Sequence, residues 1–463
     1  MRSFFCLAVL LFPCLSIGAE PFFEEVLVWD FKEGGYDTHH VYGFAVTKKG
    51  TVLAFTEGRE KAKDDNGPKD QMLKRSTDGG RTWGKDIFIE RKDGAYWNAN
   101  GHPGVKENWT NCAPVADKIT GKIFYFYALN DFARRNLQRV TKVFYKVSAD
   151  DGLTWSDRVE ITDILNVKKD GSANKDADGN WILNSEGFPS DYLGRAMHMP
   201  GPGHGIQASD GRLILQLWNR TSVRNTIDKR LYGVTIIYSD DHGDTWKFGG
   251  FVDEGKAGMN ESRLVELENG SFHINARWAM GGLAYRMVST SLDSTLDKWT
   301  TPMSETDLPR SVTVDAGMIR LTSSSKYEKS RILWAKSNDT TLAPGEHPHN
   351  ARNSMTVFMS YDEAQTWPVR KLIDPGWANY SDLAVLEDKT ILLLWAKGTG
   401  FNHQKVVVTR FNVEWLTDGK DSLVLRRKLK VSDTNGTAGC SLNSMCIHAS
   451  WCKPRTVASG LWL

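Results

Sequence analysis

Short stretches in which apolar and polar residues alternate recur along the chain, and each follows a tight-turn sequence. Alternation with a period of two is typical of a β-strand, and clusters of Gly, Asn, Asp and Lys before it are typical of a turn. The stretches are KKGTVLAF from Lys48, TGKIFYFY from Thr120, SDGRLILQLW from Ser209, ENGSFHINARW from Glu268 and EDKTILLLW from Glu387, with a looser copy from Leu321. Because no long amphipathic helical pattern interrupts them, the chain is predicted to be all-β and built of antiparallel hairpins.

A second phrase with the frame S-x-D-x-G-x-T-W recurs between these stretches. It is found as STDGGRTW from Ser76, SADDGLTW from Ser148, SDDHGDTW from Ser239 and SYDEAQTW from Ser360, with a worn copy, SLDSTLDKW, from Ser291. In this frame the Asp carboxylate accepts backbone N–H groups, Gly allows positive φ, and Trp packs beneath the turn. We therefore expect each copy to brace a hairpin turn rather than to bind a ligand.

The spacing of the repeats predicts the architecture. Successive phrases start 72, 91, 52 and 69 residues apart, which suits one four-stranded sheet with its loops. Six such units between residues 20 and 430 predict a six-bladed β-propeller of four-stranded antiparallel sheets. The stretch EEVLVWDF from Glu24 is expected to close the ring against the last blade.

The two ends of the chain differ from the repeats. Residues 1–19 contain the basic Arg2, continue as an apolar run from Phe4 to Ile17 and end in small residues, which predicts a secretory signal peptide. The run is too short for a membrane span, so we expect a secreted or periplasmic protein. Residues 431–463 are rich in Ser and Cys and are interpreted as a tail of unknown order.

Charge and composition exclude several partners. The chain has 58 basic and 56 acidic residues among 463, a formal net charge of +2. Nucleic acids and anionic membrane surfaces usually require a basic field, so neither is an expected partner. The adjacent His39 and His40 have no carboxylate or cysteine at metal-ligand spacing, so we expect no metal and no cofactor. We also expect the protein to be a monomer.

Polar residues near the ends of predicted inner strands are the candidates for chemistry, because a propeller gathers such residues around its central depression. They are Arg59 and Asp64 after the first hairpin, Glu261 in MNESRLVEL, Arg277 at the end of SFHINAR, Arg352 in NARNSMTVFMS and Tyr380 in WANYSDLAVL. Each one alone is typical of a solvated or structural residue. Their joint placement is what indicates a site.

With these motifs the chain resembles the sialidase (neuraminidase) family of glycoside hydrolases, in its secreted bacterial-type form. The resemblance covers about residues 25 to 415 and rests on the Asp-box phrases together with GTVLAFTEGRE, GPGHGIQASDGRL, NESRLVELENGSFHINAR and YSDLAVLEDKTILLLW. It implies a propeller exo-glycosidase that acts on sialylated or other acidic glycans and releases terminal sialic acid or a related nonulosonic acid.

The resemblance also implies a role for each candidate residue. Asp64 matches the family's general acid/base, with Asp65 as its competitor. Tyr380 matches the nucleophile and Glu261 its base. The arginines have binding roles: Arg277 and Arg352 match two of the three that hold the substrate carboxylate, and Arg59 matches one near the sugar's O4. A neutral Tyr suits this chemistry because the substrate carboxylate, attached to the anomeric carbon, repels a charged nucleophile.

Two positions depart from the family pattern. His40 stands where the first arginine of the carboxylate clamp is expected, and Ala396 stands where that arginine's glutamate partner is expected. We expect His40 to contact the substrate and interpret His39 as an incidental exposed or packing residue. Two alternatives stay open: a glycosidase or lyase for another acidic sugar, and a non-catalytic glycan-binding propeller.

Overall fold

The computed structural model describes residues 19–426, apart from residues 62–63, 131–140, 222–231, 255–256, 280, 344–345 and 347–350. Strands dominate this part of the chain, and the all-β prediction is confirmed. Its α-helices are the short α1 (Ala95–Ala99) and α2 (Val413–Leu416). No helix within the described ranges is long and apolar enough to cross a membrane.

The first three sheets follow one another along the chain and are antiparallel. The first contains β2 (Thr38–Val46), β3 (Val52–Arg59), β4 (Lys69–Ser76) and β5 (Ile87–Glu90). The second contains β6 (Trp109–Ala116), β7 (Ile123–Asn130), β8 (Thr141–Ser148) and β9 (Val159–Glu160). The third contains β10 (Met197–Pro200), β12 (Leu213–Arg220), β13 (Tyr232–Ser239) and β14 (Lys247–Phe251), with β11 (Ile206–Gln207) paired to β12.

The remaining strands form one four-stranded sheet, one small pair and one wide sheet. The four-stranded sheet contains β15 (Met259–Glu266), β16 (Phe272–Trp278), β18 (Met287–Thr290) and β19 (Met303–Ser304). The small pair is β17 (Leu283–Ala284) with β20 (Ser311–Val312). The wide sheet contains, in spatial order, β1 (Phe23–Trp29), β26 (Gln404–Phe411), β25 (Ile391–Gly398), β24 (Val369–Val385), β23 (Asn353–Ser360), β22 (Arg331–Ser337) and β21 (Gly317–Thr322).

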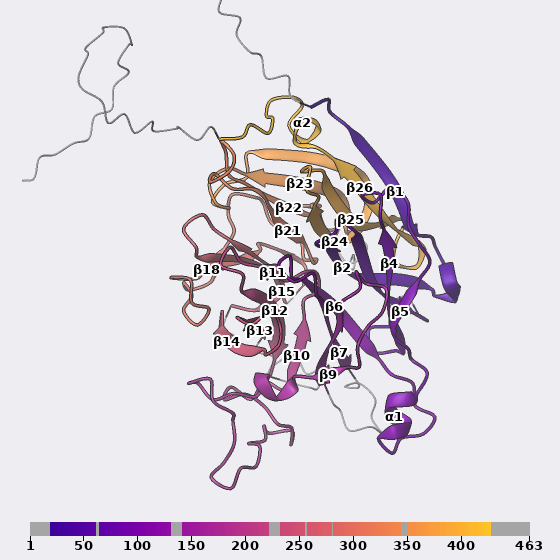
Figure 1. The fold of residues 1–463 in the computed structure, drawn as a ribbon, viewed down its shortest axis with the longest axis vertical. Helices are drawn as coiled ribbons and strands as arrows, with labels where there is room; N and C mark the ends of the chain where they lie inside the picture. Colours follow the sequence, from indigo (N-terminus) through magenta and orange to yellow (C-terminus); the bar gives the residue numbers. More distant parts are fainter. Residues whose placement is uncertain are drawn as a thin grey trace, which may run out of the picture. The chain divides into compact units, whose positions relative to one another are not determined.

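The long strand β24 joins two groups of strands within the wide sheet. Its first half pairs with β23, where Lys371 faces Val357, and its second half pairs with β25, where Leu383 faces Leu393. Figure 1 shows the sheets following one another in a propeller-like ring. The propeller prediction is confirmed, and the count of six blades stays a prediction.

The inner strands of neighbouring sheets lie against one another, so the centre of the ring is densely buried. Strand β2 contacts β6 and β24, and β15 contacts β21. Every residue of β2, THHVYGFAV, is buried. This explains why its sequence lacks clean alternation, since a strand covered on both faces does not need an outward polar row.

The alternating stretches of the sequence are the second strands of the units. They are β3, β7, β12, β16 and β25, and the looser copy contains β22. The stretch EEVLVWDF forms most of β1, which pairs antiparallel with β26, with Phe23 opposite Phe411. The prediction that the alternating stretches are strands and the prediction that EEVLVWDF pairs with the end of the propeller are both confirmed. The predicted signal peptide, up to residue 18, and the predicted tail lie outside the described residues.

The S-x-D-x-G-x-T-W phrases are turn braces, as predicted. In the first copy Ser76 Oγ donates to Asp78 Oδ1 at 2.7 Å and accepts from Gly80 N at 2.8 Å. Asp78 also accepts from the backbone N and the hydroxyl of Thr82, at 2.9 and 2.6 Å. In the fourth copy Ala364 adopts φ of 65° at the glycine position, a conformation that glycine takes at lower cost.

The Asp78 turn predicts a pH-dependent contribution to stability. Burial raises the pKa of Asp78, but hydrogen bonds from Thr82 and Ser76 outweigh it and lower the pKa to about 2. The stabilisation is therefore present above the ordinary Asp pKa of about 4 and is lost as pH falls towards 2. We expect Asp78→Ala to lower the free energy of unfolding by about 1–2 kcal/mol at pH 7. Urea unfolding should show that the difference in unfolding free energy between wild type and Asp78→Ala becomes smaller below pH 4. An equal difference at pH 7 and pH 3 would contradict the assignment.

Candidate active site

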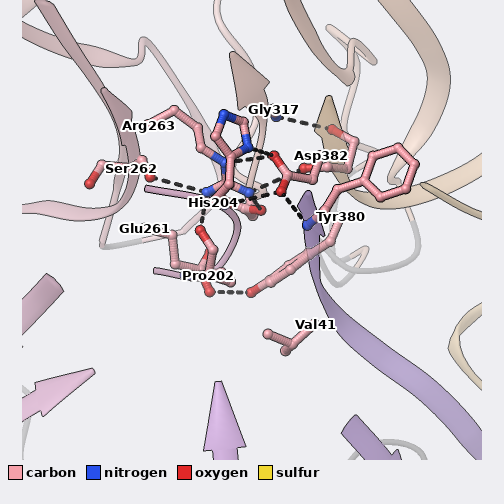
Figure 2. A network of polar contacts seen from close by, with 12 residues as sticks. Val41, Pro202, His204, Glu261, Ser262, Arg263, Gly317, Tyr380 and Asp382 are labelled. Carbon is pink, nitrogen blue, oxygen red and sulfur yellow. Dashed lines mark hydrogen bonds and ion pairs between the residues drawn. The ribbon is translucent and has the colours of Figure 1, made fainter. Parts of the chain in front are cut away.

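Tyr380, Glu261 and Arg277 form a hydrogen-bonded group at one end of the inner strands. Tyr380 lies on β24, Glu261 on β15 and Arg277 near the end of β16. The Tyr380 hydroxyl donates to Glu261 Oε1, the contact drawn between them in Figure 2. Arg277 Nη1 donates to Tyr380 Oη at 3.0 Å and to Glu261 Oε2 at 2.7 Å. The structure thus brings these three predicted residues together.

The electrostatics of this group keep the tyrosine protonated in the resting protein. Burial raises the pKa of Tyr380 well above its usual value, and the Glu261 carboxylate raises it further. Burial lowers the pKa of Arg277, but Glu261 and Tyr380 outweigh it and hold the pKa above its usual value. Glu261 is therefore the base placed to accept the proton if Tyr380 becomes a nucleophile.

Arg352 lies beside this group just before β23. It is 1% exposed, and its Cζ is 5.6 Å from the centroid of the Tyr380 ring. Its Nη1 donates to Asn379 Oδ1 at 2.7 Å. Burial and the nearby charge of Arg277 lower the pKa of Arg352 to about 10, which leaves it charged at neutral pH. Arg277 and Arg352 therefore place two positive charges beside Tyr380, as an acidic ligand requires.

His40 packs against the ring of Tyr380. It is 2% exposed, and its ring centroid is 4.6 Å from that of Tyr380 and 4.7 Å from that of Phe401. The pairing of β2 with β3 is interrupted by a bulge after His40, where Val41 has a φ of 61°. Ala396 is fully buried on β25, whose pairing with β24 is interrupted at the residues before Ser381. The position of the expected clamp arginine is thus taken by an aromatic contact.

His39 is a buried packing residue, so the exposed alternative for it is wrong. It is 2% exposed, and its ring lies 5.5 Å from the rings of both Trp29 and Tyr36. Burial lowers its pKa to about 3, which keeps the imidazole neutral. Within the described ranges, His39 and His40 belong to no cluster of three or more His, Cys, Asp or Glu side chains that could hold a metal ion.

The loop after β3 separates its two carboxylates. Arg59 pairs with Glu57 through Nη2 at 2.8 Å and with Asp65 Oδ1 through Nη1 at 2.8 Å. Asp64 is half-buried, and its Oδ1 accepts from the backbone N of Asn66 at 2.9 Å. The structure therefore brings Asp65 to Arg59, and the acid/base role of Asp64 stays a prediction.

A buried charged network lies next to the site, and it was not predicted from the sequence. Arg263 on β15 binds Asp315 at 2.8 Å. It also binds Asp382 at 3.1 Å, and His204 Nδ1 lies 2.9 Å from Asp382 Oδ1; Figure 2 labels Arg263, His204 and Asp382. Burial raises the pKa of Asp315 to about 7 despite Arg263. Asp382 has a lowered pKa because His204 and Arg263 outweigh its burial. Arg263 lies in the phrase NESRL and Asp382 in the phrase YSDL, two positions from Glu261 and from Tyr380 respectively, and this proximity was the available signal; Asp315 and His204 lie in other segments.

Gly203 shows how closely the chain packs on this network. A Cβ at Gly203 would lie 2.0 Å from Arg263 Cζ, and the residue has φ of 83°. Only glycine meets both conditions without displacing the arginine. The glycine-rich phrase GPGHG thus has a packing function and holds His204 against Asp382.

Comparisons with known proteins indicate the family and the fold of the chain. A model of the BNR repeat-like domain matches residues 50–393. The sialidase of Micromonospora viridifaciens is 29% identical over 419 residues, which cover 86% of this chain and 55% of that protein. The structure of the Hadza microbial sialidase Hz136 gives a TM-score of 0.66 at 22% identity over 84% of this chain and 68% of the other. The intramolecular trans-sialidase from Ruminococcus gnavus gives 0.62 at 16% identity over 84% and 98%.

The chain belongs to the BNR repeat-like domain family, and its resemblance to bacterial-type sialidases is confirmed. At these identities the likeness to solved structures establishes the propeller fold. The chain spans about half the length of the Micromonospora sialidase, 55%.

Proposed function

We propose that the chain is a retaining exo-glycosidase that releases terminal sialic acid or a related nonulosonic acid from glycoconjugates. The observation that carries the proposal is the group formed by Tyr380, Glu261 and Arg277, in which a buried tyrosine hydroxyl donates to a carboxylate. A propeller that only binds glycans needs no such nucleophile–base pair. Similarity to sialidases supports the same substrate class.

The proposed reaction has two displacements at the anomeric carbon. In the first, Tyr380 Oη bonds to that carbon and its proton passes to Glu261, while the bond to the leaving oxygen breaks and that oxygen takes a proton from Asp64. In the second, water attacks the same carbon, gives its proton to Asp64 and displaces Tyr380, which recovers its proton from Glu261. Two inversions give net retention.

The arginines bind the substrate carboxylate in this scheme. Arg277 and Arg352 are charged and adjacent to Tyr380, and their planar guanidinium groups match two carboxylate oxygens. Arg59 would contact the sugar's O4 from the neighbouring strand. The His40 ring packs beside Tyr380, and its imidazole stands where a third arginine is expected. We infer a clamp of two arginines.

Asp64 remains our candidate for the acid/base. Asp65 is 74% exposed and paired with Arg59, and such a pair favours the ionised carboxylate. An acid must hold a proton, and Asp64 makes no ion pair with Arg59 in the described structure. Asp64→Asn and Asp65→Asn therefore form a matched pair for assigning the role.

We also propose that the protein acts outside the cytoplasm, on extracellular or periplasmic glycoconjugates, because residues 1–19 predict a signal peptide. We further propose that the protein acts as a monomer, and that the reaction needs no cofactor because every step above uses side chains of this chain.

A panel of 4-methylumbelliferyl glycosides tests the function. It should include sialic acid, its deaminated analogue and uronic acids, with NMR of the first-formed product to establish the anomer. We expect release from the nonulosonic acids with retention. Release from uronic acids alone would favour the alternative suggested by His40 and Ala396, a glycosidase or lyase for another acidic sugar. Glycan binding without release from any of them would favour a non-catalytic propeller.

A further inference from the structure

Lys69 opens β4 and is completely buried beneath the loop that carries Asp64 and Asp65. The proposed reaction does not use it. Its Nζ donates to the backbone oxygen of Asp65 at 2.6 Å and to Asn108 Oδ1 at 3.0 Å, and lies 3.8 Å from Glu57 Oε2. Burying an ammonium is costly unless its charge is paired and its N–H donors are hydrogen-bonded. The contacts of Lys69 meet both requirements.

The contacts of Lys69 converge on one residue of the loop. Asn108 Nδ2 also donates to the Asp65 backbone oxygen, at 3.3 Å, and Arg59 Nη1 binds the Asp65 carboxylate at 2.8 Å. Asp65 is thus held through its main chain by Lys69 and Asn108 and through its side chain by Arg59. Asp64 is the adjacent residue, and its carboxylate bonds within the loop to Asn66 N. The placement of Asp64 therefore follows the anchoring of Asp65.

We propose that Lys69 is a positioning residue for the proton-transfer step: by holding the Asp65 carbonyl, it fixes the loop that presents Asp64 to the leaving oxygen. This inference rests on the proposed function and adds a residue to it. Burial lowers the pKa of Lys69 to about 8 against the opposing effect of Glu57, which leaves the ammonium largely charged at neutral pH. The other charged groups acting on it are Arg59 from β3 and the two loop carboxylates.

The leaving group distinguishes positioning of the acid from a general structural role. A sugar hydroxyl is a poor leaving group and depends on protonation, whereas 4-methylumbelliferone leaves readily as its anion. General acid catalysis contributes about 10²–10⁴-fold, and a displacement of about 1 Å costs on the order of 10²-fold. A misplaced Asp64 should therefore slow cleavage of a glycan far more than cleavage of the aryl glycoside.

The experiment compares kcat/KM of Lys69→Met on 3′-sialyllactose and on 4-methylumbelliferyl sialoside. Methionine nearly preserves the length of the side chain and removes the ammonium, while Glu57 keeps its pair with Arg59. We expect a loss of about 10²-fold on the glycan and less than about fivefold on the aryl substrate. Lys74→Met is the matched control, since Lys74 is a buried lysine on the same strand that binds Val28 O at 2.8 Å, and it should leave the ratio unchanged.

The ratio of the two rates stays informative if Lys69→Met folds poorly, because a smaller folded fraction lowers both rates equally. Asn108→Ala, which removes both contacts of that amide, should shift the ratio in the same direction. Equal losses on the two substrates, no loss, or the same shift in Lys74→Met would overturn the role of Lys69 while wild-type turnover still supports the proposed function. A wild-type protein that cleaves neither substrate overturns both proposals.

Discussion

Replacement of Tyr380 by phenylalanine is expected to reduce kcat/KM on 4-methylumbelliferyl sialoside by more than about 10³-fold. The change removes one oxygen and with it the covalent route, and loss of a nucleophile typically costs about as much as loss of the whole catalytic group. The ring would remain against His40 and Arg352, so binding of the product sugar should change little. Steady-state kinetics measures the loss of kcat/KM, and calorimetry measures the binding of the product sugar.

A matched tyrosine is available to control this experiment. Tyr361 donates to Asp421 at 2.8 Å, and its pKa is raised by burial and by that carboxylate, as at Tyr380. Tyr361→Phe removes the same kind of bond away from the site and should retain nearly full activity. Glu261→Gln should lower kcat strongly, since the amide cannot accept the Tyr380 proton. Turnover by Tyr380→Phe within tenfold of wild type would refute the nucleophile.

Restoring the missing clamp partners is the second change with a large expected effect. Ala396 is fully buried, so Ala396→Glu alone would bury an unpaired carboxylate and destabilise the fold by about 3–5 kcal/mol. With His40→Arg in the same chain we expect the two charges to pair and the double variant to recover most of this loss. A double-mutant cycle of unfolding free energies measures the coupling.

Activity of the double variant reports which acidic sugar the site binds. Gaining one charge-assisted contact to a carboxylate is worth about 1.5–3 kcal/mol, about ten- to hundredfold in binding. If the native substrate is a sialoside, KM should fall by that factor. If activity on the best substrate of the panel collapses instead, the His40 ring is adapted to a different acidic sugar. Independent, additive effects of the two substitutions would contradict the idea that these positions form a pair.

Much of the fold could be predicted because its information is local. A turn followed by an alternating stretch identifies the second strand of each unit, and the Ser76–Asp78 type of brace fixes where a hairpin ends. The pairing of β1 with β26 was also foreseeable, since an unmatched first strand needs a partner. The irregular bulge at Val41 was not foreseeable, because positive φ at a β-branched residue is imposed by tertiary packing.

The site was predictable in its residue types and less so in its contacts. Glu261 and Arg277 lie near the ends of β15 and β16, where the repeat directs attention, whereas Tyr380 lies within the long strand β24. Side-chain direction within a loop does not follow from a repeat, and the contact between Asp65 and Arg59 was therefore not predicted. The partners of Lys69 come from three separate segments, and a contact of that kind leaves no periodic trace in the sequence.

The pairing of β1 with β26 has a consequence for the order in which the molecule is made. A ribosome delivers β1 first, and its partner follows almost 390 residues later, since Phe23 pairs with Phe411. Contacts of such long sequence separation form slowly, and until then both strands expose unpaired edges that invite aggregation. The sheet completed by this step also holds Tyr380. A nascent chain therefore completes the sheet that holds Tyr380 only after Phe411 has been synthesised.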